Sequence, residues 1–143
     1  MWLYQGEEFT SDKIGDYVGF VYCLTDTENG KKYIGKKRFT RKITRPPLKG
    51  KKRKRRSVAE SDWQTYYGSS PETKALVEEF GGERFKREIL HLCHSLGEMS
   101  YGEIYYQIKH KVLFDDNYYN KFIGCRLHAN HLKDVDPDSF EDF

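Results

Sequence analysis

The chain has 143 residues, of which 37% are hydrophobic and 33% charged, and a formal net charge of +3. This length predicts a single domain over residues 1–143 with one modest core, and the apolar content excludes a disordered chain. Because no apolar run approaches the roughly 18 residues that span a bilayer and the N-terminus lacks a signal-peptide pattern, we expect a cytoplasmic protein that does not enter a membrane. The three cysteines, without a close-spaced pair, fit reduced thiols.

Residues 17–25 and 31–37 predict two strands joined by an Asn-Gly turn. The first run, YVGFVYCLT, is rich in β-branched and aromatic residues, and Asn-Gly is a strong hairpin signal. A two-residue turn places Tyr33 opposite Asp26, a position on the same face as Tyr22, because side chains alternate along a strand. We therefore expect both tyrosines on one face, unless a bulge or a longer loop changes the register.

Residues 31–59 concentrate the positive charge, with 15 of the 25 Lys and Arg residues and no Asp or Glu. The rest of the chain is net negative, with 10 basic against 22 acidic residues. Such a segment attracts a polyanion by releasing its counterions, so nucleic acid is the expected partner. Residues 36–56 are predicted to form an extended basic loop, since two prolines and a glycine interrupt them. A solvated loop or a localisation signal would have the same composition.

The second half of the chain predicts further elements. Residues 57–67 could form a short helix, and residues 71–80 predict a clearer one with Ser70 as N-cap. Alternating side chains over residues 85–93 suggest a third strand. The acidic tail, residues 134–143, is expected to fray.

Residues 95–113 predict the last helix. Met99, Glu103, Tyr106 and His110 follow one another at spacings of 4, 3 and 4 residues and so form one stripe. This stripe places a carboxylate among residues that should face the sheet.

The hairpin and this helix resemble the signature of the GIY-YIG nuclease family. GFVY is followed eleven residues later by YIG, the helix contains GEIYYQI, and YYNKFIG is similar to the Tyr-Asn close of that domain. The resemblance covers residues 17–124, and the PPLKGKKRKRR insertion before SDWQTYYGSS is most similar to small phage-encoded members grouped with homing-type endonucleases. It implies an α/β (α+β) fold, a small central three-stranded antiparallel sheet flanked by helices, here with a basic loop insertion.

The resemblance implies that the protein is an endonuclease that hydrolyses DNA phosphodiester bonds with one divalent metal ion, Mg²⁺ or Mn²⁺. Tyr22 and Tyr33 match the signature tyrosines, and Glu103 matches the metal-binding carboxylate. Gly19 and Gly35 match the flanking glycines. The further matches are a lysine after YIG, Lys36, and a late asparagine, Asn120.

The catalytic arginine of the family has no clear match. Its usual position, about ten residues past the second tyrosine, is Ile43, and its close neighbours are Arg38, Arg41 and Arg45. If the basic loop delays the helix until about residue 57, Arg55 or Arg56 takes this role, and we favour Arg56 as the catalytic residue.

The chemistry independently explains several of these residue types. Phosphodiester hydrolysis needs an in-line water, a group that takes its proton and a positive charge beside the phosphate, and Mg²⁺ needs few protein ligands. Tyr22 can be the base only if Lys36 or a metal-bound water lowers its pKa, about 10 unperturbed, or if it relays a proton. Gly35 would leave room for the DNA backbone. Under the simple turn Lys36 lies on the opposite face, so either the strand bulges at Gly35 or Lys37 reaches the site.

The basic segment supplies the expected DNA contacts: Lys37, Arg38, Arg41, Arg45, Lys51, Lys52, Arg53, Lys54 and Arg55. Because no DNA-reading domain is appended, we expect low intrinsic sequence specificity, or specificity gained through a homodimer or a partner protein.

Two alternatives stay open. The first is a catalytically silent nucleic-acid-binding or adaptor protein with the same fold. The second is a zinc-stabilised interaction module. Its ligands would come from His91, Cys93 and His94 and from Cys125, His128 and His131, whose spacing matches no common paired-knuckle pattern. Trp63, Tyr66 and Tyr67 could stack on bases, but core packing is the favoured interpretation.

Overall fold

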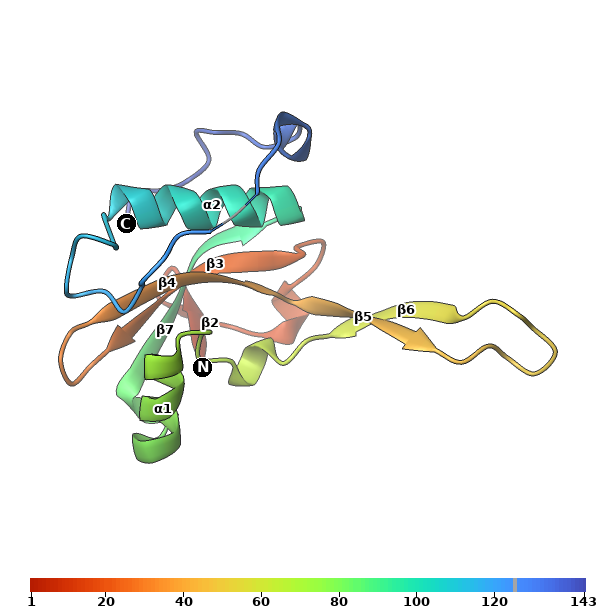
Figure 1. Ribbon diagram of the computed structural model, residues 1–143, viewed down its shortest axis with the longest axis horizontal. Helices are drawn as coiled ribbons and strands as arrows, with labels where there is room; N and C mark the ends of the chain where they lie inside the picture. Colours follow the sequence, from red (N-terminus) through yellow and green to blue (C-terminus); the bar gives the residue numbers. More distant parts are fainter. Residues whose placement is uncertain (125) are drawn as a thin grey trace.

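A computed structural model of the protein describes residues 1–124 and 126–143. A five-stranded sheet in the order β2-β1-β7-β3-β4 forms its centre, with helix α1 on one side, helix α2 on the other, and a two-stranded ribbon that projects from the body (Figure 1). The strands of the sheet are β1 (Trp2–Tyr4), β2 (Glu7–Phe9), β3 (Gly19–Asp26), β4 (Lys32–Arg38) and β7 (Phe85–Cys93). The ribbon consists of β5 (Thr40–Arg45) and β6 (Arg55–Glu60), and the helices are α1 (Pro71–Phe80) and α2 (Leu96–Lys109).

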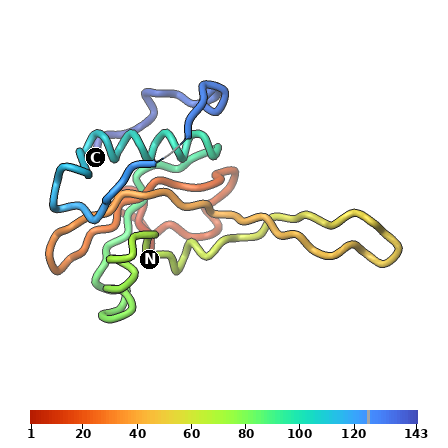
Figure 2. The backbone as a smooth tube through the Cα atoms, in the orientation of Figure 1, coloured from red at the N-terminus to blue at the C-terminus, as the bar shows by residue number. Residues whose placement is uncertain are grey.

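The α+β class and the three predicted strands are confirmed, because β7, β3 and β4 form an antiparallel core. The strand count was too low. The N-terminal strand β1 pairs in parallel with β7, and β2 pairs with β1, so the sheet has five strands and is mixed. Trp2 fixes this addition: it is buried, and its Nε1–H donates to the carbonyl of Trp63 at 2.7 Å. Figure 2 shows these two distant segments side by side.

The β3–β4 register differs from the prediction but keeps its parity. Tyr22 lies opposite Gly35, and Tyr33 lies opposite Leu24. The two-residue turn was wrong, because the backbone of Asp26 already pairs with Lys31, at 2.7 Å, and the connection is longer. The register moves by two residues, an even number, so the two tyrosines still share one face of the sheet.

The two faces of the sheet carry separate cores. One contains Phe20, Tyr22 and Leu24 of β3, together with Phe39 and Trp63. The other face contains Val21, Cys23 and Ile34, which pack against Met99 and Tyr106 of α2. The helix stripe predicted from residue spacing therefore does face the sheet.

Several element boundaries were predicted wrongly. The basic loop of residues 36–56 contains the end of β4, the whole of β5 and the start of β6, and residues 57–67 form no helix: they continue β6 and end in a 3-10 turn at Trp63–Thr65. Helix α1 is confirmed, with Ser70 capping the N–H of Thr73. Helix α2 begins after the N-cap Ser95 but ends at Lys109.

The C-terminal tail does not fray. Phe140 is buried in the core on the α2 side, and the Tyr106 hydroxyl donates to the carbonyl of Glu141 at 2.8 Å. The expectation was wrong because the tail combines its acidic residues with an aromatic anchor, and burial of that anchor opposes the entropy of ordering. No helix among the described residues is long and apolar enough to cross a membrane.

A buried ion pair ties the β3–β4 hairpin to the start of β7, and a hydrogen bond ties it to the segment after α2. The Asp26 carboxylate accepts hydrogen bonds from Arg84 Nε and from the Tyr119 hydroxyl, both at 2.7 Å. Burial alone would raise the pKa of Asp26, but the hydrogen bonds from Arg84, Tyr119 and the Glu28 N–H lower it below its ordinary value. The ionised carboxylate therefore stabilises the fold.

Asp26→Asn is expected to lower the free energy of unfolding by about 3 kcal/mol, since it removes the buried member of the ion pair and leaves Arg84 without its counter-charge. A depressed pKa gives stability that is complete above the unfolded-state pKa, about 3.9, and is lost as the pH falls through the folded-state value. Denaturant unfolding at several pH values should show a weaker acid dependence for the variant, with the exposed Glu28→Gln as control. An Asp26→Asn variant as stable as the wild type would contradict this account.

Candidate active site

The space above Gly35 holds the two signature tyrosines. A Cβ atom placed on Gly35 would lie 2.5 Å from the Tyr22 hydroxyl and 3.0 Å from the ring of Tyr33. The two tyrosine rings are 6.3 Å apart between centroids. Gly35 is itself buried, so its missing side chain makes room for tyrosines, and the expectation that it makes room for DNA was wrong.

Tyr22 presents a buried hydroxyl with no hydrogen-bond partner among the described residues. Burial raises the pKa of Tyr22 well above its ordinary value of 10.0, and the neighbouring Tyr66, Tyr33 and Glu103 raise it further. The phenol is thus held in its protonated form. Tyr33 differs, because its hydroxyl is 2.9 Å from the Ser69 hydroxyl at a more exposed position. Burial raises the pKa of Tyr33 as well.

Glu103 and Lys36 meet on the other face of the same strand. The Lys36 ammonium donates to the Ser100 hydroxyl of α2 at 2.8 Å, one turn before Glu103. Burial raises the pKa of Glu103 above 4.5, while the charge and the backbone N–H of Lys36 act to lower it. The carboxylate is therefore partly desolvated beside a fixed cation.

The β3–β4 pairing is continuous through Gly35, without a bulge. Lys36 therefore lies on the α2 face and Lys37 on the tyrosine face. The Lys37 ammonium lies 4.2 Å from the centroid of the Tyr66 ring and 2.6 Å from the Asp62 carboxylate. The two lysines that follow Gly35 therefore lie on opposite faces of the sheet.

Side-chain amides form hydrogen bonds with the free backbone edge of β4. Asn120 accepts from the backbone N–H of Ile34 at 3.1 Å and donates to its carbonyl at 2.9 Å. Gln107 of α2 donates to the same carbonyl at 3.0 Å. These bonds occupy the backbone groups that an edge strand leaves unpaired, so the Asn120 amide fixes the strand that carries Tyr33 and Lys36.

A cavity of about 420 Å³ joins several of these groups. Tyr33, Glu103 and Asn120 all line it, although they come from β4, α2 and the segment after α2. Its other lining residues include Ser69, Ser70, Glu72, Gln107, Lys121 and Phe122. Sequence reasoning assigned no site role to these six. The SDWQTYYGSS stretch, noted only as similar to relatives, was the available signal for the two serines.

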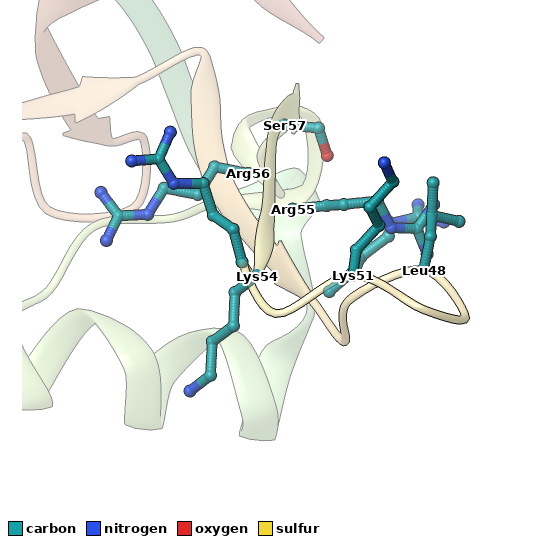
Figure 3. A pocket seen from close by; sticks show the side chains of 8 residues that line it. Leu48, Lys51, Lys54, Arg55, Arg56 and Ser57 are labelled. Atoms are coloured by element: carbon teal, nitrogen blue, oxygen red, sulfur yellow. The ribbon is translucent and has the colours of Figure 1, made fainter.

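Arg56 lies outside this cavity. The helix on which its prediction depended is absent, and Arg56 instead pairs with Thr44 in the projecting ribbon. In Figure 3 it lies with Lys54, Arg55 and Lys51 around a hollow near the ribbon end. That hollow is lined by Arg45, Leu48, Lys51, Arg53, Lys54, Arg55, Arg56 and Ser57. Lys52 is also exposed there.

A second basic surface connects the ribbon with the site. A groove of about 630 Å³ lies along the end of β4 and the start of β5, and contains Lys36. Its other cations are Lys37, Arg38, Arg41 and Lys42. The Arg38 Nε is buried without a hydrogen-bond partner among the described residues. Positive charge therefore extends from the neighbourhood of Glu103 to the base of the ribbon.

The predicted zinc ligands are only partly brought together. His91, Cys93 and Glu98 have their ligand atoms within 4.8 Å of one another, while His94 is exposed and its ring lies against Tyr17. The Glu98 carboxylate is engaged by His91 Nε2 at 3.0 Å and by the His94 N–H at 2.6 Å.

The second group of predicted zinc ligands, Cys125, His128 and His131, forms no cluster among the described residues. Cys125 lies outside the described residues. The Nδ1 atoms of His128 and His131 each accept a backbone N–H, at 3.0 and 3.1 Å, so neither Nδ1 atom is free to bind a metal ion in this arrangement.

The Glu103 carboxylate supplies oxygen atoms, the ligand type that hard divalent cations prefer. Within residues 1–124 and 126–143, Glu103 belongs to no cluster of three His, Cys, Asp or Glu ligands. It lines the cavity of about 420 Å³ instead, together with oxygen-bearing side chains such as Ser69 and Asn120. Mg²⁺ and Mn²⁺ suit such a site, because they accept one or two carboxylates and retain several waters.

Comparison with known proteins agrees with this geometry. A family model described as "Putative endonuclease segE, GIY-YIG domain" matches residues 2–123. No curated protein and no solved structure gave a match. The match begins at β1, so the N-terminal strands belong to the domain as well as the hairpin and α2. With most of its length matched and both signature tyrosines packed above Gly35, the chain belongs to the GIY-YIG nuclease family.

Proposed function

We propose that the protein is a DNA endonuclease that hydrolyses phosphodiester bonds with Mg²⁺ or Mn²⁺ bound at Glu103. The observation that carries this proposal is the shared cavity of Tyr33, Glu103 and Asn120, with the Lys36 charge acting on Glu103. A divalent ion bound there would polarise the phosphate and supply an activated water.

The residues around Glu103 have distinct proposed roles. Lys36, held by Ser100, supplies a fixed positive charge for the phosphate as negative charge develops on it. Tyr22 keeps its proton at neutral pH because of its raised pKa, so it relays a proton or donates a hydrogen bond and does not act as a phenolate base. Tyr33, oriented by Ser69, contacts the substrate from the cavity wall. Asn120 is a positioning residue.

The basic surfaces support DNA as the substrate. The groove from Lys36 to Lys42 and the ribbon form a continuous cationic track, whereas acidic residues dominate the rest of the chain. Contacts with phosphates release counterions, so binding should weaken steeply with salt. This track would lead the DNA backbone to the cavity at Glu103.

Glu103→Gln tests the metal assignment. We expect plasmid cleavage in Mg²⁺ to fall by at least about 100-fold, the loss typical of removing one electrostatic group from a reacting centre, with DNA binding in EDTA unchanged. Glu72→Gln is the matched control, because Glu72 lines the same cavity and should retain activity within a few-fold. Normal cleavage by Glu103→Gln would contradict the proposal. Binding without cleavage by the wild type in any divalent metal would favour the silent adaptor.

Tyr22→Phe removes only the phenolic hydroxyl and so tests whether that group serves catalysis or stability. It removes a buried hydroxyl that has no partner, so the thermal midpoint should stay the same or rise. Cleavage should nevertheless fall by about 100-fold, the lower range for loss of a proton-transfer group. Single-turnover cleavage and thermal unfolding of the same preparation measure both. Full activity with a lower thermal midpoint would show that the hydroxyl is structural.

A further inference from the structure

The β5–β6 ribbon is an ordered element without a layer packed behind it. All its strand residues are exposed except Thr40, Ile43 and Ala59, which are half-buried. Isolated two-stranded hairpins are marginally stable in water, and Figure 1 shows the ribbon projecting beyond the body. A projecting strand pair with both faces accessible is suited to enter a partner.

The base of the ribbon is fixed to the core. Phe39 is fully buried between β4 and β5, and its ring lies 5.1 Å from the centroid of Trp63. After β6, the Ser61 N–H donates to the Phe39 carbonyl at 2.7 Å, and the Ser61 hydroxyl donates to the Arg38 carbonyl at 2.6 Å. The direction of the ribbon is therefore set relative to the cavity at Glu103.

The two faces of the ribbon differ chemically. Cross-strand pairing places Lys42 opposite Val58 and Thr44 opposite Arg56 on one face. The other face carries Arg41, Arg45 and Arg55 with Ile43, Ser57 and Ala59. Figure 3 shows Arg56 and Lys54 directed to one side and Arg55 and Lys51 to the other.

The first face mixes the groups that read base edges. Arginine binds guanine O6 and N7 with two hydrogen bonds, a threonine hydroxyl serves any base, and an apolar side chain contacts the thymine methyl group. Val58 is 68% exposed, which is costly in water and useful against such a methyl group. The arginines of the opposite face are long enough to reach the flanking phosphates.

The dimensions of the ribbon favour the major groove of B-DNA. A strand of six residues is about 20 Å long, and a two-stranded ribbon fits the major groove of B-DNA, about 12 Å wide, but not the minor groove, about 6 Å wide. The major groove of an RNA duplex is too narrow and deep for side chains to read. The ten Lys and Arg residues between Thr40 and Glu60 match the charge of the groove walls.

We propose that the β5–β6 ribbon enters the major groove of duplex DNA and reads base pairs with the face formed by Lys42, Thr44, Arg56 and Val58. This inference rests on the proposed endonuclease function, whose specificity it defines, and it replaces the expectation of low intrinsic specificity. Since Phe39 and Ser61 fix the base of the ribbon to the sheet that carries Glu103's neighbour Lys36, the base pairs that are read lie on one side of the cut.

Selection from a random duplex library tests this proposal. The full chain is used in EDTA, so that no cleavage occurs and a failure of catalysis cannot affect the result. The wild type should enrich a motif. Arg56→Lys with Val58→Ala, which keeps the charge, should lose preference at one or more positions by about fivefold or more. Arg45→Lys with Arg55→Lys, equally conservative on the opposite face, should keep the wild-type motif.

Two measurements identify the groove and the mode of contact. Replacing a guanine of the motif by 7-deazaguanine, which lacks N7, should weaken binding of the wild type more than binding of the Arg56→Lys, Val58→Ala variant, because a lysine makes a weaker contact with N7 than the two-pronged arginine does. All three proteins should show the same salt dependence. The proposal is overturned if the wild type enriches no motif, if an RNA duplex competes equally, or if only the opposite-face variant changes the motif. Loss of cleavage with a retained motif would overturn the endonuclease assignment alone.

Discussion

The candidate site depends on the absence of a side chain at Gly35. Two aromatic side chains occupy the volume that a Cβ would need, and the Tyr22 hydroxyl ends 2.5 Å from that point. Because Tyr22 is fully buried and packed against Trp2, it has no room to move aside. The glycine in YIG is thus a packing requirement of the tyrosines, and through them of the cavity wall.

The same strand also explains how residues from distant parts of the chain converge. Strand β4 is at the edge of the sheet, so its backbone is open to partners on one side. Asn120 and Gln107 bind that edge at Ile34, and Lys36 next to it faces Glu103. The unpaired backbone groups of an edge strand can pair with another chain and cause aggregation. Here it is closed at one end by amide side chains and flanked at the other by lysines.

Sequence reasoning reached the elements whose signals are local. The shared face of Tyr22 and Tyr33 and the inward Glu103 follow from periodicity, and the Ser70 cap follows from the Ser-Pro start of the helix; each has its counterpart in the structure. The ribbon was missed because its strands carry no buried face, so the alternation that marks most strands is absent. Strand β1 was missed because three residues give no period, and Trp2 acts through long-range contacts. The helix assumed for the Arg56 assignment is absent, and Arg56 lies in the ribbon instead.

Gly35→Ala tests the central claim most directly, because the added methyl group would meet the Tyr22 hydroxyl and the Tyr33 ring. The variant should bind DNA in EDTA like the wild type, retain its circular dichroism spectrum, and lose most of its metal-dependent cleavage under single-turnover conditions. Cleavage at the wild-type rate by a folded Gly35→Ala protein would contradict the account, since the tyrosines would then not need the space that the glycine leaves.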